Sequence, residues 1–135
     1  MGAVNKATKH DGPLKGARVL VVEDDFFIGT ELAAILSDAG ADVLGPTQTI
    51  ADALQVAGAA RISAAIVDIR LGSETVEPVA RRLAERRIPF LFYTGQARLD
   101  PVRAEWPHCR VIAKPALPET IIAAVASIVG ERISN

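Results

Sequence analysis

The chain of 135 residues contains a single cysteine, few aromatic side chains and almost no net charge. One cysteine, Cys109, excludes an internal disulfide, and no group of cysteines and histidines has the spacing of zinc ligands. Aromatic residues make up only 4% of the chain, although half of all residues are apolar. We therefore expect one domain with an aliphatic core, in a reducing and cytoplasmic setting.

The low charge and the lack of long apolar runs exclude two classes of partner. The chain has fifteen basic and sixteen acidic residues, and non-specific nucleic-acid binding depends mainly on an excess of basic charge. No run of about 18 apolar residues is long enough for a transmembrane helix, and residues 1–15 lack the apolar run of a signal peptide. We expect a soluble protein that binds neither nucleic acid nor membrane.

The chain alternates between strand-like and helix-like patterns. Residues 1–16 are mostly polar and without period, which predicts a flexible leader before a domain at 17–132. Within that domain we expect strands near 18–23, 43–44, 64–67, 88–93 and 110–113, and helices near 26–39, 49–59, 77–86, 101–106 and 118–130. Continuous aliphatic strands between helices are typical of an α/β fold with a parallel sheet covered on both faces. For five such units the common order is 2-1-3-4-5, the flavodoxin-like doubly wound arrangement.

Polar residues follow four of the predicted strands at the point where each strand ends. They are Glu23-Asp24-Asp25, Asp68, Thr94 and Lys114-Pro115. The carboxyl ends of parallel strands meet at one edge of the sheet, where ligands bind. The predicted order places Asp24 and Asp68 on neighbouring strands roughly 5 Å apart, with Lys114 about 10 Å from Asp68. This arrangement favours a divalent cation on one side, phosphate-neutralising groups on the other, and phosphoryl chemistry on Asp68.

These motifs resemble the receiver domain of response regulators in two-component signalling. The resemblance covers about residues 17–132 and rests on four segments, 21–24, 66–71, 92–95 and 114–115. Residues 68–75, 78–80 and 89–92 also resemble stand-alone, single-domain receivers of bacteria.

The resemblance implies a role for each pocket residue. Asp68 is the acceptor of a phosphoryl group from a histidine kinase or a histidine phosphotransfer protein. Thr94 and Lys114 bind the phosphoryl oxygens. The implied Mg²⁺ ligands are Asp24, Asp68, the main-chain carbonyl of Arg70 and, through water, Glu23. The chain would be a signalling domain rather than an enzyme, acting through protein contacts, with a homodimer possible, or as a phosphate shuttle or sink.

The sequence departs from the family pattern at the last strand. Val111 stands where the family usually carries a switch tyrosine or phenylalanine, and Ala97 stands where related stand-alone receivers often have tyrosine. We therefore expect the response to phosphorylation to pass more through residues 95–107 than through a side-chain rotation in the last strand. The resemblance also implies a cis peptide bond between Lys114 and Pro115.

Two other functions are compatible with such a fold. A receiver-like scaffold that is not phosphorylated would be favoured by loss of Asp24, Asp68 or Lys114, and all three are present. A magnesium-dependent phosphatase with an aspartyl intermediate usually needs a second aspartate two residues beyond the nucleophile, where this chain has Arg70.

Two interpretations remain open for Trp106, which either covers the edge of the core or anchors a partner.

Overall fold

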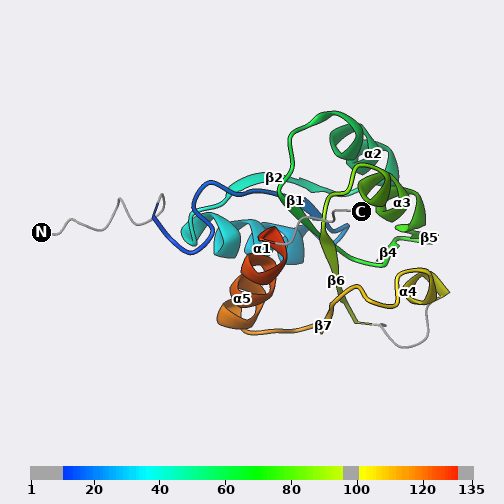
Figure 1. The fold of residues 1–135 in the computed structure, drawn as a ribbon. Coiled ribbons are helices and arrows are strands. Elements are labelled where there is room, and N and C mark those ends of the chain that lie inside the picture. The colour runs from blue at the N-terminus through cyan, green and yellow to red at the C-terminus, as the bar shows by residue number, and fades with distance from the viewer. Residues whose placement is uncertain (1–10, 96–100, 131–135) are drawn as a thin grey trace, which may run out of the picture.

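The computed structural model describes residues 11–95 and 101–130, which form a parallel five-stranded sheet between helices (Figure 1). The sheet consists of β1 (Arg18–Val22), β2 (Asp42–Thr47), β3 (Ala64–Val67), β6 (Phe90–Thr94) and β7 (Val111–Ala113). The helices are α1 (Phe26–Asp38), α2 (Ile50–Ala59), α3 (Glu77–Glu85), α4 (Pro101–Glu105) and α5 (Pro118–Val129). The strand order is β2-β1-β3-β6-β7, which confirms the predicted order 2-1-3-4-5 when the strands of this sheet are counted along the chain.

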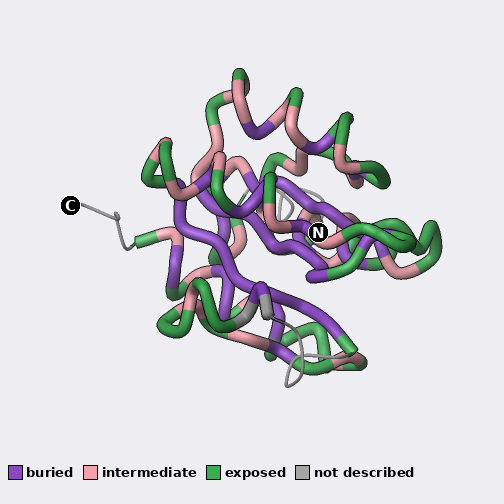
Figure 2. Tube along the Cα trace, turned by 90° about the vertical axis from the view of Figure 1, so that its right-hand side faces the viewer, coloured by how far each residue is buried: buried purple, intermediate pink, exposed green. Residues whose placement is uncertain are grey.

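The sheet separates two aliphatic cores, because successive side chains of a strand point to opposite faces. In β1, Val19 and Val21 pack in the core that α1 and α5 cover, whereas Leu20 and Val22 pack in the core that α2 and α3 cover. The trace is buried along the central strands and exposed on the outer helices (Figure 2). This two-sided burial explains why the strands are continuous apolar runs rather than alternating ones.

Side-chain caps fix where the first two helices begin. The Asp25 carboxylate accepts a hydrogen bond from the Ile28 amide at 3.0 Å, and the Thr49 hydroxyl accepts one from the Asp52 amide at 3.1 Å. Each bond satisfies an amide that has no partner within its own helix. The cap at Asp25 starts α1 directly after Asp24.

The packed structure begins before residue 17, where the sequence pattern placed the domain boundary. Leu14 is buried in the core that α1 covers, and its amide donates a hydrogen bond to Ala39 O at 2.8 Å. Residues 11–16 show no strand or helix period because a single apolar side chain ties them to the core. Residues 1–10 of the expected leader lie outside the described residues.

Two further elements differ from the sequence prediction. Strand β2 extends over six residues rather than the two expected, and it contains a cis Gly45–Pro46 bond that the sequence analysis did not anticipate. A small hairpin, β4 (Arg70–Leu71) with β5 (Glu74–Thr75), lies between β3 and α3. The other element boundaries differ from the prediction by no more than two residues.

Within the described residues, no helix has the length and apolar character needed to span a bilayer.

Candidate functional site

Strand register brings the predicted polar residues to one edge of the sheet. Val22 of β1 pairs with Val67 of β3, so the residues that follow, Glu23 and Asp68, emerge side by side. On the other half of the sheet Thr94 of β6 pairs with Ala113 of β7, and Lys114 follows directly. The parallel register therefore brings Glu23, Asp68 and Lys114 to the same edge of the sheet.

Three carboxylates gather on the β1 and β3 side of this edge. Glu23, Asp24 and Asp68 each offer an oxygen, and these oxygens lie within 4.8 Å of one another. Glu23 and Asp68 are buried, at 1% and 8% exposure, whereas Asp24 is exposed. The Gly72 amide, in the turn of the β4–β5 hairpin, donates a hydrogen bond to Asp24 Oδ2 at 2.7 Å. The hairpin thus holds one carboxylate of the cluster.

Lys114 reaches this cluster from β7 across the sheet. Its Nζ lies 2.7 Å from Asp68 Oδ2 and 2.8 Å from Glu23 Oε1. Burial acts to lower the pKa of the ammonium, but the hydrogen bonds and charges of Asp68 and Glu23 outweigh it, so the Lys114 pKa is raised. The lysine is therefore a fixed positive charge beside the predicted phosphoacceptor.

Glu23 is the most buried member of the cluster. Its amide donates to Thr47 O at 2.9 Å, and its Oε2 accepts from the Asp25 amide at 3.1 Å. Desolvation by burial raises the Glu23 pKa, and the charge of Asp68 adds to this, although the Lys114 and Asp25 contacts oppose it. Glu23 Oε1 lies 2.8 Å from the Lys114 ammonium and has no other hydrogen-bond donor among the described residues.

The composition of the cluster fits a divalent cation. Oxygen atoms are the ligands that Mg²⁺ prefers, and among the described residues the buried Glu23 Oε1 has no donor other than the Lys114 ammonium. Three carboxylates against one ammonium also leave two formal negative charges, which one divalent cation offsets. The residues present therefore suit Mg²⁺ on charge and ligand type.

The structure places Thr94 and Arg70 around the same pocket. Thr94 ends β6, is 2% exposed and has a carbonyl that accepts from the Lys114 amide at 3.1 Å. Arg70 begins β4 and pairs with Thr75 in the hairpin ladder. The phosphoryl contact of the Thr94 hydroxyl and the metal contact of the Arg70 carbonyl stay predictions. The Lys114–Pro115 bond is cis, as the resemblance implied.

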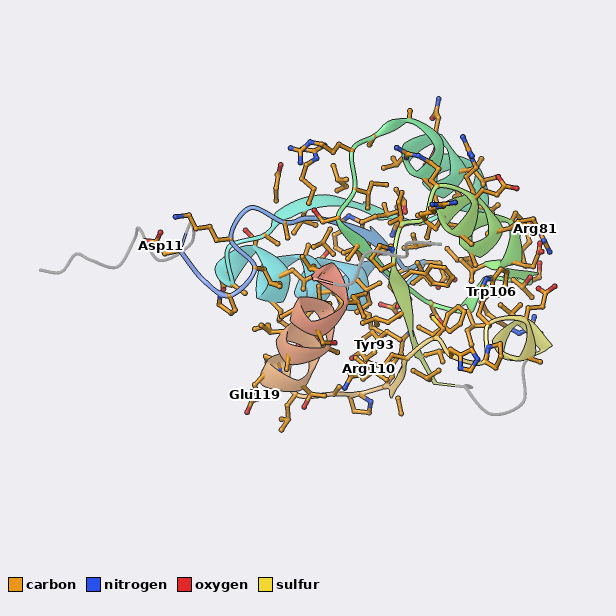
Figure 3. All side chains as sticks on the ribbon, viewed as in Figure 1. Asp11, Arg81, Tyr93, Trp106, Arg110 and Glu119 are labelled. Carbon is orange, nitrogen blue, oxygen red and sulfur yellow. The ribbon has the colours of Figure 1, made fainter. Side chains whose placement is uncertain are left out.

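Tyr93 contributes contacts that the sequence patterns did not predict. Its hydroxyl accepts a hydrogen bond from the Ala116 amide at 3.3 Å, and Lys114 Nζ lies 5.7 Å from the centre of its ring. Figure 3 shows Tyr93 between β6 and α5. Alternation along β6 would have placed Tyr93 on the α5 side of the sheet. It would not have revealed the contact with the loop after Lys114.

The arginines on α3 and directly after it have partners that explain their positions. Arg81 pairs with Glu77 and Glu105, and Arg86 donates to Ala57 O and Ala60 O at the end of α2. These contacts suit a solvated helix face rather than a nucleic-acid surface.

Trp106, which follows α4, lies at the edge of the core. It is half-buried, and its ring meets Phe90 edge to face at 5.9 Å between centroids. This favours packing over the open alternative of a partner anchor.

Comparison with family models and with curated protein sequences gives no match. Solved structures do match. A response regulator receiver protein from Sinorhizobium medicae is 24% identical with a TM-score of 0.77, over 88% of this chain and 98% of that one. The receiver domain of a sensor histidine kinase from Pseudomonas aeruginosa, with magnesium coordinated in its active site cleft, is 24% identical with a TM-score of 0.74, over 86% and 99%.

A third structure is a response regulator from Burkholderia pseudomallei that carries a phosphorylated aspartic acid, a calcium ion and citrate. It is 29% identical with a TM-score of 0.70, over 84% of this chain and 70% of that one. The chain therefore has the fold of response regulator receiver domains, which confirms the resemblance that its motifs indicated.

Proposed function

We propose that this chain is a single-domain receiver that accepts a phosphoryl group on Asp68 from a histidine kinase or a histidine phosphotransfer protein. One observation carries the proposal. The Asp68 carboxylate lies 2.7 Å from the Lys114 ammonium and in one cluster with Glu23 and Asp24, and at 8% exposure it is less enclosed than Glu23 at 1%. The chain then signals through protein contacts or serves as a phosphate shuttle or sink.

The transfer forms one bond and breaks one. An oxygen of the Asp68 carboxylate attacks the phosphorus of the donor's phosphohistidine, a P–O bond forms, and the P–N bond breaks. Its electron pair stays on the imidazole nitrogen, which takes up a proton from solvent. The Lys114 ammonium offsets the charge that builds up between carboxylate and phosphoryl group, and the Thr94 hydroxyl binds a phosphoryl oxygen.

Glu23, Asp24 and Asp68, with the main-chain carbonyl of Arg70, would hold Mg²⁺. When bound, the ion neutralises carboxylate and phosphoryl charge as a Lewis acid. The magnesium in the Pseudomonas receiver domain supports this assignment, as does the gathering of three carboxylates whose oxygens lie within 4.8 Å of one another. Labelling of the protein by acetyl phosphate is expected to require Mg²⁺ and to stop when EDTA is added.

Replacing Asp24 by asparagine is expected to weaken Mg²⁺ binding at least about ten-fold, because the exposed member of the cluster loses its charge. Isothermal titration calorimetry measures the affinity. Asp52→Asn is the matched control, since it removes another exposed aspartate, from α2. An Asp24→Asn protein that binds Mg²⁺ as tightly as the control would contradict the metal assignment.

Exposed apolar side chains beside the pocket support a protein donor. Among the described residues the large exposed hydrophobics are Phe26, Phe27 and Leu117, at 63%, 80% and 63% exposure. The phenylalanines begin α1 directly after the acidic residues, and Leu117 lies in the loop after Lys114. Apolar groups gathered beside a reactive site are typical of a protein contact surface.

Replacing Phe27 by alanine is expected to slow transfer from a phosphorylated kinase about ten-fold, the effect of losing one well-packed interface residue. Labelling by acetyl phosphate serves as the internal control and should keep its rate, since a small donor needs no docking surface. Rapid-quench measurements with both donors give the comparison. If the substitution slows transfer from both donors equally, Phe27 supports the structure of the pocket and does not contact the kinase.

A further inference from the structure

Tyr93 joins the pocket lysine to the loop that leads into α5. Its side chain is 6% exposed and packs in the core between the sheet, α1 and α5. The ring lies near the Lys114 ammonium, and the hydroxyl accepts from the Ala116 amide. One side chain therefore touches both the charged pocket and the backbone two residues beyond Lys114.

Packing alone does not require the hydroxyl group. A phenylalanine would fill the same space, but a buried hydroxyl needs a partner, and the partner here is the Ala116 amide. At 3.3 Å this hydrogen bond is longer than the usual 2.7–3.2 Å range, so it is weak. A small displacement of the ring or of the loop is enough to break or shorten it.

The ammonium of Lys114 has three neighbours whose balance depends on the charge of Asp68. It contacts the carboxylates of Asp68 and Glu23 directly and lies 5.7 Å from the centre of the Tyr93 ring. Phosphorylation replaces the single negative charge of the Asp68 carboxylate by about 1.5 to 2 negative charges, which lie on the phosphoryl oxygens. The ammonium is then drawn toward the phosphoryl oxygens, and its contacts with Glu23 and the ring change.

The part of the structure that a change at Tyr93 would reach follows from the face of the sheet on which Tyr93 lies. Tyr93 pairs with Ile112 of β7, and both face the core that α5 covers. Val111 belongs to the opposite side, against the core of α2 and α3. A change at Tyr93 therefore reaches Ala116 and the first turn of α5, not α4.

We propose that Tyr93 is a positioning residue through which movement of the Lys114 ammonium alters the loop 115–117 and the start of α5. The proposal rests on phosphorylation of Asp68. It also revises the expectation from the sequence that the response passes mainly through residues 95–107.

Hydrogen exchange of the full chain, with and without acetyl phosphate and Mg²⁺, tests this relay from Lys114 through Tyr93 to α5. In the parent, phosphorylation should change amide protection at 116–121 by about two- to ten-fold, the effect of gaining or losing one hydrogen bond. Tyr93→Phe keeps the ring and removes the hydroxyl, and most of this difference should disappear. Phe92→Leu is the matched control, because it removes an aromatic ring from the same strand on the opposite face.

The comparison is made at equal phosphoryl occupancy, measured by intact mass. A purely structural role of Tyr93 would shift exchange equally in both states and leave the difference between them intact. Tyr93→Phe with the full parental difference would overturn the relay, as would a parental response in α4 with none at α5. A parent that forms no acyl phosphate would refute the proposed function as well, and the mass measurement separates these cases.

A second measurement needs no substitution at Tyr93. It is the single tyrosine of the chain, so incorporation of 3-fluorotyrosine gives one ¹⁹F resonance. Acetyl phosphate should shift this resonance in the parent. The shift should vanish in Asp68→Asn and in Lys114→Ala, because the signal passes through the ammonium. An undiminished shift in phosphorylated Lys114→Ala would refute the relay.

Discussion

Asp68→Asn is expected to abolish acyl-phosphate formation from both a kinase and acetyl phosphate while leaving the fold intact. The amide has nearly the shape of the carboxylate, and its oxygen still accepts a hydrogen bond from Lys114. It lacks the negative charge and nucleophilicity that the transfer requires. Because Asp68 is 8% exposed in a packed edge of the sheet, a near-isosteric change preserves that packing.

Mass spectrometry after borohydride reduction identifies the modified residue directly. Asp52→Asn serves as the control and should be labelled like the parent, since Asp52 lies on α2 outside the cluster. Label on another residue, or full labelling of Asp68→Asn, would refute the assignment of the acceptor. A parent that binds a kinase but takes no label from any donor would instead favour the unphosphorylated scaffold.

The strand order was predictable because strands and helices are easily told apart in this chain: the strands are continuous apolar runs, and the helices between them carry apolar residues at helical spacing. Segments such as 64–67 are apolar throughout and 0% exposed in the structure, which is the pattern of a central parallel strand. Right-handed crossovers and short connections then leave few possible orders for five units. From that order alone, Asp24 and Asp68 had to follow neighbouring strands.

The contacts inside the pocket were less predictable, because they depend on side-chain reach. Strand spacing put Lys114 about two strands from Asp68, but it did not say that the same ammonium also contacts Glu23 at 2.8 Å. The resemblance implied a water-mediated role for Glu23, which stays a prediction, but it did not say that this side chain is buried at 1% exposure. Burial of a carboxylate is decided by the neighbouring strands and is not visible in its own sequence segment.

Short elements were not predictable for a different reason. The β4–β5 hairpin has two residues in each strand, too few for a period to be visible. Its turn at Gly72 nevertheless positions Asp24 through a backbone amide. Likewise, the single buried side chain of Leu14 ties residues 11–16 to the core without any pattern around it.

Removing the pocket lysine is expected to separate phosphorylation from its structural response. In Lys114→Ala, Asp68 should still accept some phosphoryl group from acetyl phosphate, because its carboxylate and the metal-binding acids remain. The change in protection at 116–121 should be mostly lost, since no ammonium remains to move between Asp68, Glu23 and the Tyr93 ring.

The same substitution is expected to cost about 1–3 kcal/mol of unfolding free energy in the absence of Mg²⁺, because the buried Glu23 carboxylate loses its ion-pair partner. Saturating Mg²⁺ should restore part of this stability, since a ligand that binds only the folded chain stabilises it. Urea unfolding with and without Mg²⁺ measures both effects. Lys15→Ala is the control, because the pair between Lys15 and Asp11 is exposed and its loss should change stability by less than about 1 kcal/mol. If Lys114→Ala unfolds like this control and responds to phosphorylation like the parent, the ammonium neither stabilises the acid cluster nor transmits its charge.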